Sequence, residues 1–272
     1  MCDSIWDFSR IGAVIVNSTP KYFTLLDAFF GMYFRYRNNF QWPVYFATEV
    51  ADHPIVRMLE EKYPLQVLVL PAEQSDFLES RKAALELLPT QVKYVLMLQE
   101  DFLLERPGIK EDDINEMVHR MEREANIHSV RLMPCPGPKG TVVAGQRWAP
   151  LDVGVDEYYF TFQASVWRRD SLFQYLDAVI RQACSGPGIP KKRTREYNVY
   201  QVSGNPAENQ VGKGILVGLF GQEAQHMAWV RHGNYPNGVY NCPFPYRPTA
   251  IVKGVLQEWA KELVVREGFR YA

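Results

Sequence analysis

Cysteine is scarce in this chain of 272 residues, and its four cysteines are widely separated. They stand at positions 2, 135, 184 and 242, and no two of them form a CxxC pair. Zinc knuckles and disulfide-stapled scaffolds require paired or closely spaced cysteines. Neither kind of fold is therefore expected, and the pattern favours a reducing compartment such as the cytoplasm.

Long apolar runs are also missing. A membrane-spanning helix needs about 20 consecutive apolar residues, and no segment of the chain approaches such a run. The first ten residues, MCDSIWDFSR, carry acidic side chains where a signal peptide would be basic. We expect no transmembrane segment, and any association with a membrane is expected to be peripheral.

An excess of either charge is absent as well, since 30 basic side chains nearly balance 31 acidic ones. A nucleic-acid partner would require a strong basic field, so none is expected. The one dense basic run lies within positions 191–195, as Lys191, Lys192, Arg193 and Arg195. It is interpreted either as a solvated loop or as a flap over a phosphorylated donor or an anionic acceptor.

Two catalytic signatures do not occur. No GxGxxG follows the first expected strand, which disfavours a dinucleotide-binding dehydrogenase. No GxSxG is present, which disfavours a serine hydrolase. The chain offers instead a regular alternation of short apolar runs and helical patterns.

This alternation predicts an α/β fold with a mostly parallel central sheet flanked by helices. Short apolar runs predict buried strands at 11–16, 43–48, 66–70 and 93–98. Helical spacing predicts helices over 22–36, 54–62 and 75–89, the last of them capped by Ser75. The remaining expected elements are helices over 110–125, 169–184 and 255–265 and strands over 129–133 and 157–165. One large domain over 1–272 accommodates them all.

An acidic pair, Glu100 and Asp101, comes directly after the fourth expected strand. Ligands of open α/β sheets gather at the carboxyl ends of the strands. A carboxylate next to an apolar strand is costly unless it is paired or bound to a cation. The pair predicts a Mg²⁺ or Mn²⁺ site, and the alternative is that both acids begin a solvated loop.

A helix carrying Arg81, the strand YVLML and the segment QEDF follow one another here. In this order they resemble the donor-binding half of GT-A glycosyltransferases, where a DxD-like motif holds a metal ion on a nucleoside diphosphate. The resemblance implies a GT-A-like fold with a donor half over 1–104. Residues 105–272 would form the acceptor-binding half and a C-terminal lid. Because no second aspartate follows, the metal ligand is expected to be Asp101 first and Glu100 second.

The same resemblance assigns roles to other residues of the first half. Asn17, Ser18 and Thr19 would lie beside the nucleobase and ribose, and Glu49 would be a ribose partner. Arg81 would contact the diphosphate, and Gln99 would complete the donor-binding motif. The alternatives are an ordinary turn at 17–20 and an exposed helical arginine.

In the second half, the segment with Trp167 and Arg168 is similar to an acceptor-side segment of GT-A enzymes, although a lone tryptophan slightly favours a core role. The segment NPAENQVGKG resembles the element that supplies a catalytic base, here Glu208. A late histidine would add a metal ligand; His232 is preferred to His226, and structural roles are the alternative for both. Lys253 would reach a phosphate, and the Gly/Asn/Tyr/Pro-rich segment after His232 resembles a lid.

Together these residues predict a glycosyltransferase of the hexosyl or deoxyhexosyl type. It would move a sugar from a UDP- or GDP-linked donor to a glycan or other hydroxyl acceptor. Inversion with Glu208 as base is expected, and retention is left open because it would remove that role. The alternatives are a sugar nucleotidyltransferase, which the glycine-free NSTPKYF loop disfavours, and a non-catalytic carbohydrate-binding protein.

Overall fold

The computed structural model describes residues 8–71, 76–134, 138–139, 145–156, 158–183, 208, 210–230, 239–248 and 250–271. Its main sheet contains β1 Gly12–Asn17, β2 Val44–Thr48, β3 Leu65–Val69, β4 Tyr94–Gln99, β5 Ile127–Arg131, β6 Trp148–Pro150, β7 Ser165–Arg168 and β8 Gln225–Trp229. A separate hairpin consists of β9 Ile251–Val252 and β10 Val255–Leu256. The helices are η1 Pro20–Tyr22, α1 Phe23–Tyr36, α2 Pro54–Lys62, α3 Phe77–Leu87, α4 Glu111–Arg123, α5 Arg169–Ala183, α6 Gln210–Phe220 and α7 Glu258–Arg266.

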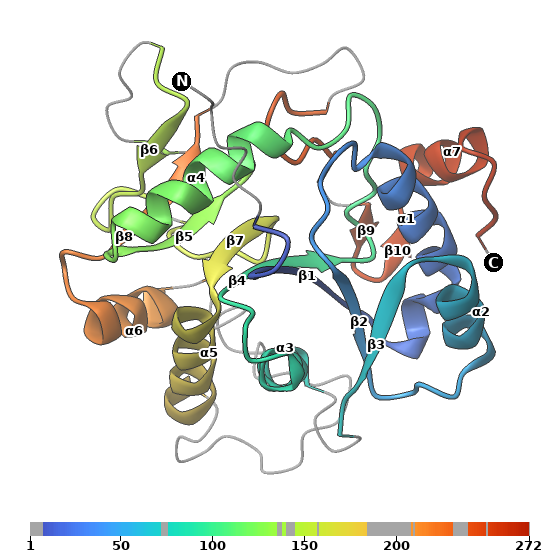
Figure 1. The fold of residues 1–272 in the computed structure, drawn as a ribbon, viewed down its shortest axis with the longest axis horizontal. Coiled ribbons are helices and arrows are strands. Elements are labelled where there is room, and N and C mark those ends of the chain that lie inside the picture. Colours follow the sequence, from blue (N-terminus) through green and yellow to red (C-terminus); the bar gives the residue numbers. More distant parts are fainter. Residues whose placement is uncertain are drawn as a thin grey trace.

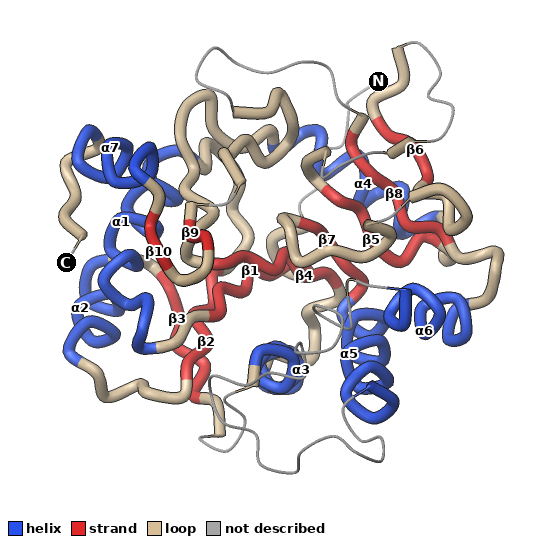
Figure 2. The backbone as a smooth tube through the Cα atoms, turned by 180° about the vertical axis from the view of Figure 1, so that it is seen from behind, coloured by secondary structure: helices blue, strands red, loops and turns tan. Residues whose placement is uncertain are grey.

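The strands of the main sheet lie in the order β3-β2-β1-β4-β7-β5-β8-β6 (Figures 1 and 2). Pairings among β1 to β4 are parallel, as is that of β5 with β8, whereas β7 and β6 are antiparallel to their neighbours. The predicted α/β class with a mostly parallel sheet flanked by helices is confirmed. Strands from both predicted halves of the chain enter the same sheet.

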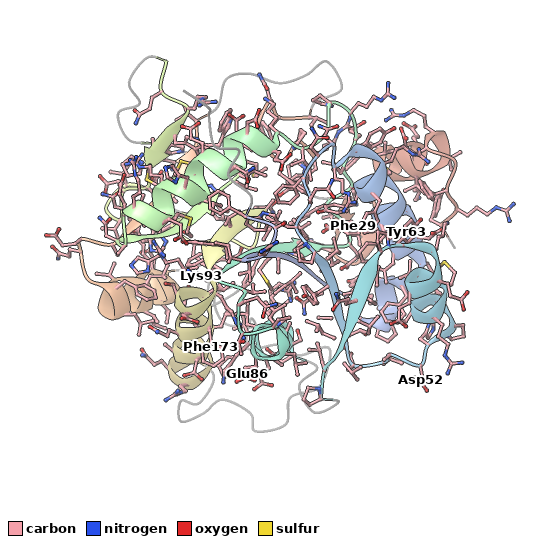
Figure 3. All side chains as sticks on the ribbon, viewed as in Figure 1. Phe29, Asp52, Tyr63, Glu86, Lys93 and Phe173 are labelled. Atoms are coloured by element: carbon pink, nitrogen blue, oxygen red, sulfur yellow. The ribbon has the colours of Figure 1, made fainter. Side chains whose placement is uncertain are left out.

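Each face of the sheet is covered by helices, and β1 shows how the sequence produces this. Val14 and Val16 face one core with α1, α2, α4 and α7, whereas Ala13 and Ile15 face a second core with α3, α5 and α6. Because strand side chains alternate between faces, a strand that is apolar at every position fits only a sheet covered on both sides. Figure 3 shows side chains filling both layers, with Phe29 in one and Phe173 in the other.

Several predicted elements are wrong in extent. The expected strand over 157–165 begins only at Ser165, because the aromatic residues before it are buried in an irregular segment. The helix expected over 255–265 begins at Glu258, because Val255 and Leu256 belong to the hairpin. Ser75 lies outside the described residues, and α3 is capped by Asp76, whose side chain accepts from Leu78 N at 2.9 Å. Helix α6 was not predicted, since its glycines break the helical pattern.

The C-terminal helix α7 is fastened to the first half of the chain, on the side of the sheet where α1 lies (Figure 1). Glu267 accepts from Arg35 at 2.8 Å and from the Tyr36 hydroxyl at 2.5 Å. Arg266 pairs with the buried Glu105 at 2.7 Å. These contacts hold the segment that contains the β9-β10 hairpin close to β1 and β4. Among the described residues, no helix combines the length and the apolar character needed to cross a bilayer.

Gly12 begins β1 under the buried ring of Trp42, and this close approach gives a test of the packing. A Cβ at position 12 would lie 2.3 Å from the ring atom Cε2 of Trp42, which is only 2% exposed. We expect Gly12→Ala to lower the free energy of unfolding by about 1–3 kcal/mol, the usual cost of overpacking a core. Urea denaturation measures this.

The matched control is Gly214→Ala in α6, where an added Cβ meets nothing within 4 Å. It should be neutral or stabilising, because alanine is the better helix former. Equal stability of Gly12→Ala and the unaltered protein would contradict the described packing of Trp42 on β1.

Candidate functional site

The carboxyl ends of three neighbouring strands form the floor of a pocket. Asn17 at the end of β1 lies in register with Ala47 of β2 on one side and with Gln99 of β4 on the other. Since the strands are parallel, the residues that follow each of them emerge at this same edge. They surround a cavity of about 760 Å³, a size suited to a nucleotide-sized ligand.

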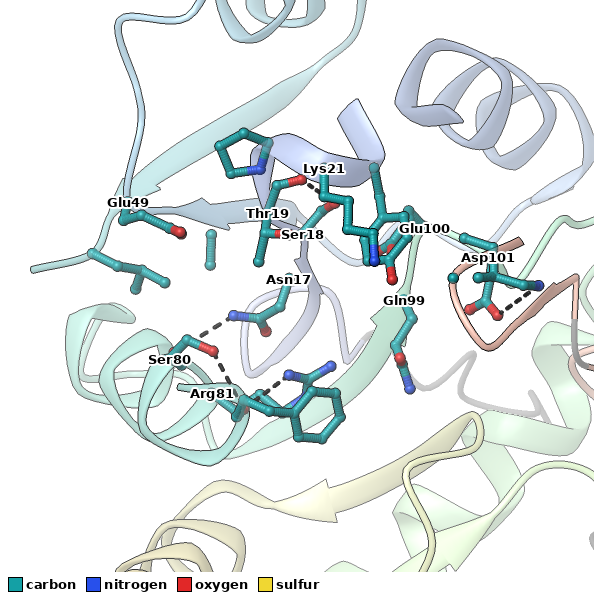
Figure 4. A pocket seen from close by; sticks show the side chains of 17 residues that line it. Asn17, Ser18, Thr19, Lys21, Glu49, Ser80, Arg81, Gln99, Glu100 and Asp101 are labelled. Atoms are coloured by element: carbon teal, nitrogen blue, oxygen red, sulfur yellow. Dashed lines mark hydrogen bonds between the residues drawn. The ribbon is translucent and has the colours of Figure 1, made fainter. Parts of the chain in front are cut away.

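Eight residues predicted from the sequence to bind the donor line this pocket: Asn17, Ser18, Thr19, Glu49, Arg81, Gln99, Glu100 and Asp101. They come from three strand ends and from α3, and Figure 4 shows their side chains around one space. Asn17 and Asp101, 84 positions apart in sequence, thus contribute to one site, because the β1-α1-β2 and α3-β4 units return each strand end to the same edge. Their individual roles stay predictions.

The two acids of the pocket, Glu100 and Asp101, both have a raised pKa. Glu100 is 7% exposed, and burial together with the neighbouring Asp101 raises its pKa to about 7. Burial raises the pKa of Asp101 to about 6, although the backbone N–H of Ile251, 3.4 Å from its Oδ2, opposes the shift. The ionised pair is therefore unfavourable by itself, and a bound cation would stabilise it.

Arg81 is the cation that the fold supplies to these acids. It projects from α3, is 5% exposed, and lowers the pKa of both Glu100 and Asp101. Its Nη1 donates to the Phe77 carbonyl at 2.9 Å, and its guanidinium lies over the Phe77 ring at 3.4 Å. A planar guanidinium held in this way is suited to contact an anionic group.

The chemistry of the pocket fits a hard divalent cation. Oδ1 of Asp101 and Oδ1 of Asn17 are buried and have no hydrogen-bond partner among the described residues. Carboxylate and amide oxygens are the ligands that Mg²⁺ and Mn²⁺ accept. In the part of the chain that the structure describes, no three His, Cys, Asp or Glu residues cluster as a complete metal site. Magnesium-type sites commonly use one or two carboxylates and take the remaining ligands from water and substrate phosphates.

Glu208 lies behind the pocket wall and does not line the cavity. Its Oε1 accepts from the backbone N–H of Phe162 at 2.8 Å and from Oγ1 of Thr161 at 3.1 Å. The Phe162 carbonyl accepts from Nε2 of Gln99 at 3.5 Å, and the Phe162 ring meets that of Phe77 at 4.9 Å. A single residue therefore separates the Glu208 carboxylate from two lining side chains.

The predicted acceptor-binding residues Trp167 and Arg168 do not line the pocket. Trp167 is 3% exposed and packs against the rings of Phe160 and Tyr175, so it is a core residue. Arg168 donates to the carbonyls of Ile127 at 2.8 Å and Glu124 at 3.2 Å, which ties β7 to the end of α4 and the start of β5. An apolar strand pattern satisfies the core as readily as a sugar platform, so the sequence did not separate the two roles.

The predictions for Lys253, His232 and His226 have different outcomes. Lys253 is exposed at the tip of the β9-β10 hairpin and does not line the pocket, whereas its neighbour Gly254 does. His232 lies outside the described residues, as do 191–195 and most of the predicted lid. His226 is buried in β8, with Nδ1 2.8 Å from Oγ of Ser129, and has the structural role that was its alternative.

Sequence reasoning missed Lys21 and the hairpin residue Ile251, which also line the pocket. Lys21 stands in the same loop as the predicted Ser18 and Thr19, so its position after the first strand was a usable signal. The hairpin has a signal too, because Lys-Gly between two valines suits a two-residue turn. Only the fold, however, brings position 251 next to position 101.

The chain was compared with known proteins. No protein-family model matches it, and no curated protein matches it. A solved 4-diphosphocytidyl-2C-methyl-D-erythritol synthase from Anaerococcus prevotii aligns with a TM-score of 0.45 and 10% identity, over 81% of this chain and 88% of that one. TarS 1-349 of S. aureus in complex with UDP aligns with a TM-score of 0.45 and 11% identity, over 80% of this chain and 57% of that one.

The glycosyltransferase GlyE of Streptococcus pneumoniae aligns with a TM-score of 0.42 and 10% identity, over 79% of this chain and 44% of that one. The chain thus spans about half the length of the TarS and GlyE structures. At TM-scores below 0.5 these likenesses support neither a substrate nor a role for any residue.

The buried His226 gives a pH test that is independent of the pocket. Burial lowers its pKa from 6.5 to about 3, so the unfolded chain takes up a proton below pH 6.5 that the folded chain does not. Stability should therefore fall as the pH drops through this range, by about 2–3 kcal/mol between pH 6.5 and 4.5. His226→Gln should be less stable at pH 7.5 but should lose correspondingly less on acidification. Urea unfolding of both proteins at pH 6.5 and at pH 4.5 measures the stability that each one loses. An equal loss in both proteins would contradict the assignment.

Proposed function

We propose that this protein is a glycosyltransferase that uses a nucleoside-diphosphate sugar, with a divalent cation held at Asp101 and Glu100. The observation that carries the proposal is the meeting of this acidic pair with Arg81 in one cavity at the carboxyl ends of β1, β2 and β4. A cation and a guanidinium side by side suit a diphosphate leaving group, whose negative charge grows during transfer. Mn²⁺ or Mg²⁺ bound there would stabilise that charge.

The polar residues at the strand ends support a nucleotide as the part of the donor that the pocket binds. Asn17 Nδ2 reaches the Ser80 carbonyl at 3.5 Å, while its Oδ1 lacks a partner within the described parts of the chain. Ala47 and Leu70 supply an apolar wall beside Glu49. A base needs an apolar wall and a few placed polar atoms, and a ribose needs an acceptor such as a carboxylate. UDP- and GDP-linked sugars are the proposed donors.

Glu208 is the proposed general base of an inverting transfer. The acceptor hydroxyl oxygen would form a bond to the anomeric carbon as the bond from that carbon to the diphosphate breaks, and the hydroxyl proton would pass to the carboxylate. The hydrogen bonds from Phe162 and Thr161 orient the Glu208 carboxylate next to the lining residues. The proposed acceptor is a glycan or glycoconjugate hydroxyl.

A nucleotidyltransferase is the second candidate and is disfavoured by the loop after β1. This loop reads Ser18-Thr19-Pro20-Lys21 and contains no glycine whose backbone could wrap a triphosphate. Its chemistry would also release pyrophosphate from a nucleoside triphosphate, which distinguishes it in an assay.

The cation site is tested with Asp101→Asn. Asparagine keeps the shape, and removing a carboxylate whose pKa is raised by burial should not destabilise the fold at pH 7.5. We expect the affinity for UDP or GDP in the presence of Mn²⁺ to fall about 10- to 100-fold, the value of a charge-assisted contact. Without Mn²⁺ the two proteins should bind alike. Isothermal titration calorimetry measures both.

Asp112→Asn is the control for this substitution, because Asp112 is exposed on α4 and does not line the pocket. It should leave the Mn²⁺-dependent affinity unchanged. Mn²⁺-dependent binding of equal strength in Asp101→Asn and the unaltered protein would remove Asp101 from the cation site.

The base is tested with Glu208→Gln. We expect the turnover of a bound donor to fall about 100- to 10,000-fold, as when a general base is lost, while donor affinity stays within about threefold. UDP or GDP release from UDP-glucose, UDP-N-acetylglucosamine and GDP-mannose is followed with Mn²⁺ present. Glu223→Gln, an exposed position beyond α6, is the control. Undiminished turnover in Glu208→Gln would exclude it as base and favour retention.

A further inference from the structure

The pocket contains a second cation, Lys21, to which neither the predicted chemistry nor the resemblance assigns a role. It lies on η1 at the end of the loop after β1 and lines the cavity. No hydrogen bond or ion pair joins its amino group to any residue that the structure describes. The amino group lies over the ring of Tyr22, 5.2 Å from the ring centroid. A lysine ammonium is a strongly hydrated donor of three hydrogen bonds, so a pocket lysine without a carboxylate partner suits an anionic ligand.

Within the described residues, no ion pair joins Lys21 to Glu100 or Asp101. Arg81 is the cation that lowers the pKa of both acids. Figure 4 shows Lys21 entering the pocket from η1, whereas Arg81 enters from α3. The two cations therefore approach the cavity from different elements.

The turn of the β9-β10 hairpin lies close to the amino group of Lys21. Its turn residues Lys253 and Gly254 have φ of 50° and 78°, the pattern of a tight two-residue hairpin turn. A Cβ at position 254 would lie 2.9 Å from Nζ of Lys21. The glycine therefore satisfies the turn and also leaves room for the lysine amino group.

The same hairpin touches the acidic pair. At its base, the backbone N–H of Ile251 donates to Oδ2 of Asp101 at 3.4 Å. Ile251 and Gly254 both line the cavity, so the hairpin borders the pocket from the acidic pair to the lysine. A ligand that places one oxygen near Asp101 and another near Lys21 would lie along this border.

We propose that Lys21 binds a phosphate group of the ligand and that Gly254 leaves room for the Lys21 amino group in the pocket. This inference rests on the proposed use of a nucleoside diphosphate and assigns the anion-binding side of the same site. It replaces Lys253, the lysine expected from the sequence, with one that lines the cavity. Lysine is a common phosphate ligand because its compact charge meets several oxygens from one point.

The first test compares nucleotides with and without phosphates. Lys21→Met should weaken UDP binding in Mn²⁺ about tenfold, which is the size of one charge-assisted contact that is partly exposed. Uridine binding should change less than about twofold, because uridine lacks the group that Lys21 contacts. GDP and guanosine serve as the second pair. Lys253→Met, on the exposed hairpin tip, is the control for loss of a nearby positive charge.

The outcomes separate this inference from the proposed function. Equal UDP affinity in Lys21→Met and the unaltered protein, or equal losses in Lys21→Met and Lys253→Met, would overturn the role of Lys21 and leave the glycosyltransferase proposal standing. Should the unaltered protein bind neither UDP nor GDP, the proposed function fails. Inorganic pyrophosphate then tests the anion site alone, and binding that does not depend on Lys21 overturns the inference.

The second test is a double-mutant cycle with Gly254→Ala. Alone, this variant should weaken UDP binding about three- to tenfold because its methyl group displaces the lysine amino group. In the Lys21→Met background it should have almost no effect. Gly221→Ala is the matched control, since Gly221 has φ of 77° but nothing within 4 Å of an added Cβ. Additive effects of the two pocket substitutions would overturn the coupling of Gly254 to Lys21.

Discussion

Two adjacent carboxyl groups leave the sheet at the end of β4, and the consequences of desolvating them shape the pocket around them. Glu100 and Asp101 each have a raised pKa, because the fold shifts both carboxyl groups toward their neutral forms. Arg81 offsets part of that cost from α3. Such a pair does not stabilise the fold by itself, since buried ionisable groups seldom do. The proposed divalent cation would offset the remainder.

The pocket is assembled from distant parts of the chain. Its floor comes from strand ends of the first 100 residues, whereas its rim includes the hairpin at 251–256. Helix α7 anchors that hairpin through the contacts of Glu267 with Arg35 and Tyr36 and of Arg266 with Glu105. The C-terminal segment thus stabilises the fold and also helps to form the site. Side chains on rigid elements keep their geometry better than side chains on long loops.

Prediction from the sequence succeeded where the signal was local. The β1 run and the β4 run are apolar at nearly every position, which identified them as buried parallel strands, and the polar residues after them identified the pocket edge. Prediction failed where burial mimicked another pattern. The aromatic segment before Ser165 resembled a strand although its rings fill an irregular part of the core. Trp167 packs on Tyr175 and so has the core role that was its alternative. A periodic pattern indicates that a residue is buried, but it does not indicate which residues it packs against.

The sequence by itself determined the α/β class and the edge of the sheet at which polar groups gather, because both follow from short-range alternation and from the residue that ends each strand. Only the tertiary structure decided which of two nearby lysines enters the cavity, that Ile251 touches Asp101, and that Glu208 stands behind Phe162. Each of these depends on contacts between residues some 45 to 230 positions apart. Local propensity contains no information about such contacts, since they arise from the packing of one complete layer against another.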